Sequence, residues 1–333
     1  MDKMQTNKRI VLASRPKGWV TEDNFRLETA PLPKPAEGEV LVKNLWLSLD
    51  PYMRGRMDDV KSYVKGVDLG EVMVGQTVGQ VLESRNERIK KGDHVLTQLG
   101  WQLFGSTKEV SKVQEGGAPL SYYLGCLGMP GMTAYFGLKE IGQPKSGDTV
   151  VVSAASGAVG SVVGQLAKLW GCRAVGIAGG AEKCGYVTRE LGFDACVDYK
   201  AGNLHRDLKE ACPKGVDVYF ENVGGAVLDT VLRVMNVSSR IVLCGMIADY
   251  DATEPYGVKT LRSVLANRIR MQGMIVFDWK DRYVEAIKAL AGYLAQGKLK
   301  YRESVIEGLE NAPRGLIGLL KGENFGKQLV KLA

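Results

Sequence analysis

Hydrophobic and polar residues follow two different patterns along this chain of 333 residues. From residue 8 to about residue 125, short apolar stretches alternate with clusters of proline and glycine, and few stretches show helical spacing. This pattern predicts a compact β-rich domain over residues 1–127. Its strand-like stretches are 9–13, 39–48, 78–82 and 93–97.

From about residue 128, apolar runs alternate with amphipathic segments, which predicts a parallel sheet covered by helices on both faces. We expect this α/β domain to span residues 128–298. Its expected strands are 149–153, 173–178, 195–199, 216–221 and 240–244, and its expected helices lie near 158–170, 181–191, 203–211, 225–235 and 280–296. The remaining segment, 299–333, is predicted to hold a strand, a helix near 309–321 and a closing strand. It is too short to fold alone, so we expect it to pack onto one of the two domains.

Residues 149–160 carry the most informative motif, an unbroken apolar run that ends in small residues. Apolar residues then recur at helical spacing from Val162 to Leu169, so the motif predicts a buried strand, a tight turn and a helix. This order is typical of a dinucleotide-binding unit, with Ala154, Gly157 and Gly160 in place of the usual three glycines. Backbone N–H groups at such a helix N-terminus can bind a pyrophosphate.

The end of the second predicted strand indicates which dinucleotide binds. A site for NAD normally has an acidic residue there, which bonds the ribose 2′-hydroxyl. Here the strand ends at Ala178, two glycines follow, and Lys183 begins the next helix. A missing acid and a cation at this corner favour a 2′-phosphate, so the sequence predicts NADP(H). Taken alone, Lys183 is better explained as an ordinary solvated helix lysine; the missing acid is what favours the phosphate contact.

Composition and charge exclude several classes of protein. The net charge is +7, but the basic residues are scattered among acids without a basic run, so nucleic-acid binding is not expected. The six cysteines form no C-x-x-C pair. We find no signal-peptide pattern and no apolar stretch of membrane-spanning length. These features predict a reduced, cytoplasmic protein without disulfides and without membrane partners.

A β-rich domain ahead of a nucleotide-binding domain resembles the medium-chain dehydrogenase/reductases, some of which use zinc. Zinc would need closely spaced cysteines, or Cys and His ligands in the first domain. No cysteine precedes Cys126, and the histidines are His94 and His205, so no metal site can be assembled. A hydride-transfer enzyme without zinc must polarise its substrate by hydrogen bonds, which makes tyrosines the candidates.

Six motifs, in order over nearly the whole chain, carry a closer resemblance. They are LSLDPYMR (47–54), LGMPGMTAY (127–135), SAASGAVG (153–160), VYFENVGG (218–225), CGMI (244–247) and LLKGENFGK (319–327). The chain resembles the zinc-independent leukotriene B4 dehydrogenase/prostaglandin reductases and looks closest to their plant NADPH-dependent alkenal, or double bond, reductases. The resemblance implies an α/β fold, with an N-terminal GroES-like β-barrel, a doubly wound Rossmann domain and a C-terminal segment that returns to the first domain. It also implies a homodimer through edge strands near 271–277, although that run fits a buried last strand as well.

The resemblance also implies positions for the cofactor residues. Gly157, Ala158, Val159 and Gly160 would face the pyrophosphate, and Lys183 and Tyr199 would hold the 2′-phosphate. Asn222 and Thr133 would lie at the ribose or phosphate. The nicotinamide half would be enclosed by Cys244, Gly245, Tyr250, Phe277 and Asn324. Three of these have a structural alternative: Tyr199 could cap its strand, and Asn222 and Asn324 could stabilise turns.

Two departures from the family pattern stand out. The family usually has a serine, a natural phosphate ligand, at the position of Gly180. Losing that hydrogen bond, worth about 1 kcal/mol or somewhat more, softens the preference for NADPH. The second departure is Ile247-Ala-Asp before Tyr250, where relatives tend to have Ser-Gln or Ser-Thr.

The implied reaction is reduction of an α,β-unsaturated aldehyde or ketone by hydride transfer to the β-carbon. A neutral phenol can stabilise the resulting enolate oxygen, and Tyr250 is our first candidate. Tyr52 is the second, more as a pocket wall, and Arg54 is better explained by a structural salt bridge. Two alternatives remain open: a quinone reductase of the same superfamily, and a protein that binds NADPH without catalysis.

Overall fold

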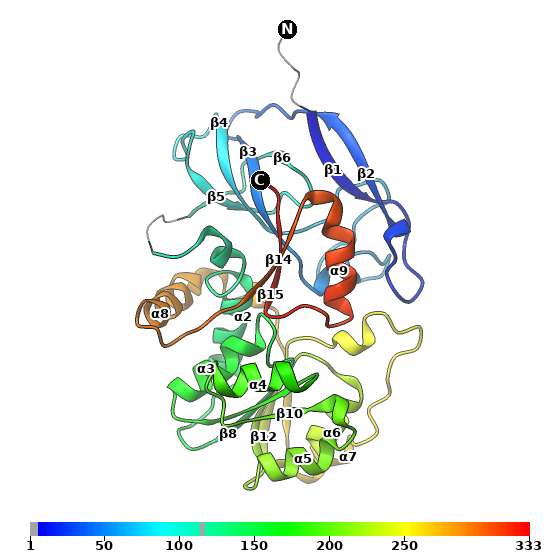
Figure 1. Ribbon diagram of the computed structural model, residues 1–333, viewed down its shortest axis with the longest axis vertical. Coiled ribbons are helices and arrows are strands. Elements are labelled where there is room, and N and C mark those ends of the chain that lie inside the picture. Colours follow the sequence, from blue (N-terminus) through cyan, green and yellow to red (C-terminus); the bar gives the residue numbers. More distant parts are fainter. Residues whose placement is uncertain (1–5, 114–116) are drawn as a thin grey trace. The chain divides into compact units, whose positions relative to one another are not determined.

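A computed structural model describes residues 6–113 and 117–333, which divide into two compact units (Figure 1). The first unit holds the chain up to Gly125 together with Glu303–Asn324 and Gln328–Ala333. The second unit holds Cys126–Arg302 together with Phe325–Lys327. The chain therefore crosses between the units more than once, and each unit is described by itself below.

The first unit is built from antiparallel, barrel-like sheets. Strands β1 (Thr6–Leu12) and β2 (Phe25–Pro31) pair with each other. A larger sheet has the order β14-β15-β3-β4-β5-β7, and β6 pairs with β3. Its strands are β3 (Val40–Ser48), β4 (Thr77–Ser84), β5 (His94–Thr97), β6 (Phe104–Thr107), β7 (Ser111–Lys112), β14 (Glu303–Glu307) and β15 (Lys327–Lys331), and the helices of this unit are α1 (Tyr52–Gly55) and α9 (Ala312–Leu320).

The four predicted strand stretches of this region form β1, β3, β4 and β5, each within a few residues of the expected bounds. Strand β2 was not predicted, because all of its residues after Phe25 are exposed or half-buried and mixed in polarity. The core of the larger sheet is formed by buried valines on facing strands, such as Val42, Val81 and Val95. These β-branched side chains favour the extended backbone that buries them.

The second unit is a doubly wound domain around a parallel sheet. The sheet order is β10-β9-β8-β11-β12-β13, the 3-2-1-4-5-6 order of a Rossmann fold. Every pair of neighbouring strands in it is parallel. The strands are β8 (Thr149–Ser153), β9 (Arg173–Ala178), β10 (Ala195–Asp198), β11 (Val216–Glu221), β12 (Met235–Leu243) and β13 (Arg270–Gly273). Bounds predicted for β8, β9 and β11 agree to the residue.

Helices connect these strands and cover the sheet. They are α2 (Met129–Phe136), α3 (Gly160–Leu169), α4 (Ala181–Arg189), α5 (Leu204–Ala211), α6 (Gly225–Leu232), α7 (Arg262–Ala266) and α8 (Tyr283–Ala295). On one face, Leu208 of α5 and Leu228 of α6 pack with Val151, Ile177 and Tyr219 of the strands. Helices α3 and α4 pack against β8, β9 and β10. Alternate residues of each strand are buried on opposite faces, which explains why these strands read as continuous apolar runs.

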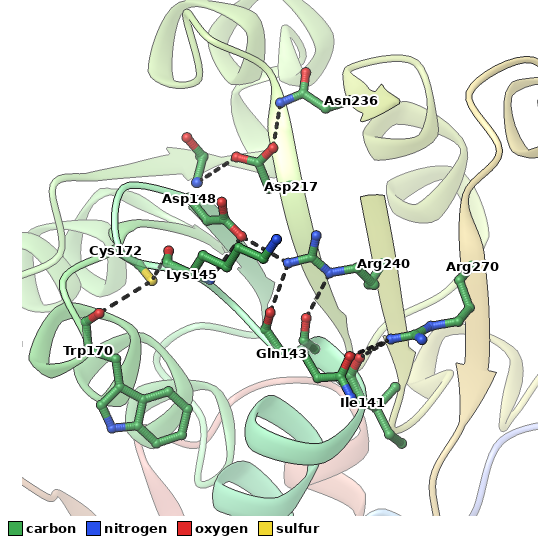
Figure 2. A network of polar contacts seen from close by, with 12 residues as sticks. Ile141, Gln143, Lys145, Asp148, Trp170, Cys172, Asp217, Asn236, Arg240 and Arg270 are labelled. Carbon is green, nitrogen blue, oxygen red and sulfur yellow. Dashed lines mark hydrogen bonds and ion pairs between the residues drawn. The ribbon is translucent and has the colours of Figure 1, made fainter. Parts of the chain in front are cut away.

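A polar network joins the amino-terminal edge of this sheet to the segment that precedes it (Figure 2). Arg240, on β12, forms an ion pair with Asp148 at 2.8 Å and donates to the carbonyl oxygens of Gly142 and Gln143. Arg270, at the start of β13, donates to the carbonyl of Ile141 at 3.0 Å. In the register of the sheet, Arg240 and Arg270 are level with Val150, near the amino end of β8, so the opposite edge is left for a ligand.

The apolar run 271–277 is only partly a strand. Strand β13 ends at Gly273, and a helical segment that begins at Val276 follows. Met274 donates its N–H to the Leu243 carbonyl and is buried, whereas the Phe277 side chain is 49% exposed. Strand β13 lies at the end of the sheet, and within the described residues it pairs with β12.

Candidate functional site

The reversal in strand order creates a crevice at the carboxyl ends of β8 and β11. These strands are neighbours in the sheet, but the chain runs outward from β8 through β9 and from β11 through β12. In open α/β sheets, ligands bind at this switch point, outside the carboxyl ends of the strands. The fingerprint turn that follows β8 and the Glu221–Gly225 turn that follows β11 both lie there.

The fingerprint turn requires small residues for steric reasons. Ala154 adopts a positive φ of 50°. A Cβ on Gly157 would lie 3.1 Å from the Ala154 carbonyl oxygen, and one on Gly160 would lie only 2.3 Å from it. Helix α3 begins at Gly160, and the N–H groups of residues 161–163 in its first turn donate to the carbonyl oxygens of Gly157 and Val159. The positive end of the helix dipole therefore lies at this turn. Together with half-buried Ala158 and Val159, this turn fits the predicted pyrophosphate cradle.

A cluster of basic and phenolic groups surrounds the end of β9. A Cβ on Gly179 would lie 2.9 Å from the Tyr199 hydroxyl and 3.0 Å from Cε of Lys200, so both side chains cover this glycine. Partial burial, and then the charge of Lys200, lower the pKa of Lys183. The two lysines repel each other at the end of the strand. A phosphate bound between them would reduce this repulsion and stabilise both ammonium groups. Lys183 and Tyr199 were predicted here, whereas Lys200 was missed, although it directly follows Tyr199.

An acidic residue, Asp198, lies near the end of β9, but its carboxylate is engaged in hydrogen bonds to the backbone. Asp198, at the end of β10, accepts hydrogen bonds from the N–H groups of Gly180 and Lys200, at 2.8 and 2.9 Å. It therefore fixes the turn before α4. Gly180 has a φ of +94°, a conformation that side chains rarely adopt. Glycine therefore fits the backbone conformation at this position more easily than the serine of the family would.

The segment Phe325–Lys327 lies against the fingerprint turn. The Gly326 N–H donates to the Ser156 carbonyl at 3.1 Å. The Phe325 ring stacks edge-on against Tyr186 of α4, with ring centroids 4.9 Å apart. The Arg302 guanidinium lies 3.8 Å above the Phe325 ring, and the Lys183 ammonium lies 6.0 Å from the ring centroid. The sequence singled out the neighbouring Asn324 but missed Phe325 and Arg302, which the fold brings together from distant positions.

The turn after β11 is fixed by a buried carboxyl group. Glu221 Oε1 accepts hydrogen bonds from the Ser153 hydroxyl at 2.7 Å and from the Val223 N–H at 2.6 Å. Its other oxygen is buried without a hydrogen-bond partner in the part of the chain that the structure describes. Burial raises the pKa of Glu221 above its ordinary value. Sequence reasoning missed this residue, because a glutamate at a strand end gives no sign of its burial.

Asn222 locks the ends of β8 and β11 together. Its side-chain amide donates to the Ser153 carbonyl and its backbone N–H to the Ser153 hydroxyl, both at 2.8 Å. This contact matches the structural alternative, in which Asn222 stabilises the turn. The same contact places its half-buried side chain at the switch point, where a cofactor would lie.

Tyr250 folds back over the end of β12. The N–H groups of Cys244 and Gly245 both donate to the Glu221 carbonyl, at 2.9 and 3.1 Å. The Tyr250 hydroxyl accepts from the Met246 N–H at 3.5 Å, and a Cβ on Gly245 would lie 3.3 Å from that hydroxyl. Burial raises the pKa of the Cys244 thiol to about 12, so this cysteine is a neutral wall residue. The Tyr250 hydroxyl lies at the carboxyl edge of the sheet.

The remaining candidates lie outside this cluster. Thr133 is on α2 and Phe277 follows β13, and within the described residues neither has a hydrogen bond or ring contact to the groups above. Asn324 and Tyr52 belong to the first unit. Burial, and then the charge of Asp50, raise the pKa of Tyr52, so its phenol stays protonated. Buried Arg54 pairs with Asp58 at 2.7 Å, which confirms its interpretation as a structural salt bridge.

Among the described residues, no group of three or more His, Cys, Asp or Glu side chains is arranged to hold a metal ion. Within the same part of the chain, none of the helices has the length and apolar character needed to cross a membrane.

Comparison with known proteins gives matches over the whole chain. A family model described as the N-terminal domain of oxidoreductase matches residues 8–114, and one described as zinc-binding dehydrogenase matches residues 158–292. The chain is 50% identical to the NADPH-dependent curcumin reductase of Escherichia coli, over 99% of this chain and 98% of that protein. It is 43% identical to a tobacco (Nicotiana tabacum) NADP⁺-dependent 2-alkenal reductase, over 98% of each chain. The crystal structure of CurA from Vibrio vulnificus in complex with NADPH superposes with a TM-score of 0.94, at 50% identity, and covers 98% of this chain and 99% of that one.

Proposed function

Because the chain belongs to the zinc-independent medium-chain dehydrogenase/reductase family, we propose that it is an NADPH-dependent reductase of α,β-unsaturated aldehydes and ketones. The observation that carries the cofactor part is the cluster of Lys183, Tyr199 and Lys200 at the end of β9. Relatives described as curcumin reductase and 2-alkenal reductase support the substrate part.

Different residues at the carboxyl edge of the sheet would bind different parts of the cofactor. The turn 157–160 would bind the pyrophosphate through backbone N–H groups, and Lys183 and Lys200 would neutralise the 2′-phosphate. Asn222 would hold the ends of β8 and β11 in register and present its amide oxygen to the ribose. Cys244 and Gly245 would form a wall beside the nicotinamide. We also assign Thr133, Phe277 and Asn324 to that half, on the family resemblance alone.

Bound NADPH supplies a hydride to the electron-poor β-carbon, which leaves negative charge on the carbonyl oxygen of the substrate. Tyr250 is proposed to donate its phenolic proton in a hydrogen bond to that oxygen. Its position over Gly245 keeps the hydroxyl at the carboxyl edge of the sheet. Tyr52 stays the second candidate, as a neutral donor in the first unit. Water can then protonate the α-carbon.

A panel of substrates tests this function. The purified chain is mixed with NADPH and with an enal, an enone, their saturated analogues and a quinone, while the absorbance of reduced nicotinamide is followed. We expect oxidation with the enal and enone and none with the saturated analogues. Turnover with the quinone alone would instead identify a quinone reductase. NADPH binding without turnover of any compound would identify a protein that binds the cofactor without catalysis.

We further propose a homodimer through the edge strand β13, in a cytoplasmic enzyme whose six cysteines are free. The exposed backbone edge of such a strand is available for pairing with a second copy. The N–H of Met274 donates to Leu243 of β12, and N–H groups alternate along a strand, so the N–H of Gly273 faces the free edge. Gly273→Pro removes this N–H and should shift the sedimentation coefficient to that of a monomer. A monomeric native chain at the same concentration would contradict the dimer.

A further inference from the structure

Two cysteines lie side by side between α4 and β10, where the proposed reaction has no use for them. Cys184 comes from the first half of α4, and Cys196 from the middle of β10 (Figure 1). Both are half-buried free thiols, so each remains accessible to a small reagent. Both side chains face the stretch Gly176–Ala178 of β9: Cys184 Sγ lies near the Ala178 carbonyl oxygen, and Cys196 Sγ lies near the Cβ position of Gly176. The two thiols therefore lie next to each other between α4 and β10.

The surrounding residues hold this pair at the end of β9. Cys184 Sγ lies 3.9 Å from the Ala178 carbonyl oxygen. Cys196 pairs in register with Gly176, and a Cβ on Gly176 would lie 3.2 Å from Cys196 Sγ and 3.0 Å from Val187 of α4. Cys196 thus points to the face that α4 covers, and the missing side chain of Gly176 leaves room for it.

We propose that Cys184 and Cys196 form an oxidation site, in which a low-molecular-weight disulfide converts the two thiols into an intramolecular disulfide that weakens NADPH binding. The formation of the bond stands on the geometry of the pair alone. Its effect on the cofactor rests on the function proposed above, because Lys183 directly precedes Cys184.

Two thiol–disulfide exchanges complete the oxidation. The Cys184 thiolate attacks one sulfur of the reagent disulfide, forms a mixed disulfide and releases the first reagent thiol. The Cys196 thiol then loses its proton, attacks Cys184 Sγ and releases the second reagent thiol. The protein loses two electrons and two protons, which the two released thiols carry. A hydrogen bond from Cys196 lowers the pKa of Cys184, so Cys184 is the thiol that attacks first.

The new bond would move the turn that carries Lys183. A disulfide holds its two sulfurs about 2 Å apart, so the two non-bonded thiols must approach each other when the bond forms. Gly180, at the start of α4, has a positive φ of 94° and open space around its Cα, so the first turn of α4 can shift there. Lys183 moves with this turn, away from the position in which it faces the 2′-phosphate together with Lys200.

Peptide mapping tests whether the bond forms. The full chain is incubated with oxidised glutathione, its remaining thiols are alkylated, and the digest is analysed by mass spectrometry. We expect a cross-linked peptide that joins Cys184 to Cys196, and neither Cys184→Ser nor Cys196→Ser should form it. Cys172→Ser, which removes a buried thiol elsewhere in the same unit, should leave the yield unchanged. A glutathione adduct that stays on Cys184 while Cys196 is still alkylated would overturn the proposal.

Cofactor titrations test the coupling. In the oxidised chain, we expect the Kd for NADPH to rise about tenfold and that for NADH to change much less, since one charged contact is lost. By linkage, saturating NADPH should slow formation of the cross-link. If the cross-link forms while both Kd values stay unchanged, the coupling to Lys183 is wrong. If the reduced chain fails to bind NADPH at all, the function proposed above fails, while the mapping result stands.

Discussion

Replacing Lys183 by alanine should weaken the binding of NADPH while sparing that of NADH. Lys183 is half-buried, and Lys200 lies close enough to lower the pKa of its ammonium group. A phosphate placed between two such charges relieves their repulsion as well as accepting hydrogen bonds. A hydrogen bond to a charged group contributes about 1.5–3 kcal/mol, which corresponds to a loss in affinity of about 10- to 100-fold.

Fluorescence titration with both dinucleotides measures this effect directly. For Lys183→Ala we expect the NADPH dissociation constant to rise by that factor, and the NADH constant to change by less than about threefold. Lys209→Ala, which removes an exposed lysine on α5, is the matched control for net charge. Lys200→Ala should act in the same direction, and the double variant should lose less than the sum of both effects. An equal loss for NADPH and NADH would refute the 2′-phosphate assignment.

Three further predictions follow from the same site and its surroundings. Gly160→Ala puts a Cβ 2.3 Å from the Ala154 carbonyl oxygen. Calorimetry should therefore show a stability loss of about 1–3 kcal/mol, and titration should show a loss of NADPH binding. The control Gly292→Ala, which has open space around it, should show neither. Tyr250→Phe should lower kcat at least tenfold with the NADPH Kd unchanged, and a normal kcat would remove Tyr250 from the mechanism. Burial opposes ionisation of Asp229, but hydrogen bonds from Thr260 and Tyr256 outweigh it and lower its pKa to about 2. Asp229→Asn should therefore cost about 2 kcal/mol above pH 4, and this difference should disappear as the pH falls through about 2; a difference that persists there would contradict the sign.

The sequence predicted those parts of the fold that have a strong apolar pattern. Strands β8, β9 and β11 are buried on both faces, so their residues form continuous apolar runs with clear ends. Strand β2 is mostly exposed and mixed in polarity, so the sequence shows no strand pattern there. Strand β13 ends earlier than expected. Met274 and Val276 lie after the strand and are still buried, so the apolar run extends beyond it.

The site was predictable where one short segment supplies it. The fingerprint turn and Lys183 follow strands that the apolar pattern located: the turn follows β8 at the switch point, and Lys183 follows the neighbouring strand β9. Residues from distant segments were missed. Phe325 and Arg302 reach Tyr186 only through the return of the chain, and the burial of Glu221 depends on Ser153 from another strand.

The proposal that this chain reduces carbon–carbon double bonds is tested most directly by tracing the hydride. An enone is incubated with the chain and NADPH that carries deuterium at the transferred position of C4, and the product is examined by NMR. We expect a saturated ketone with deuterium on the β-carbon. An allylic alcohol with deuterium on the former carbonyl carbon, or an enone recovered without deuterium, would contradict the account.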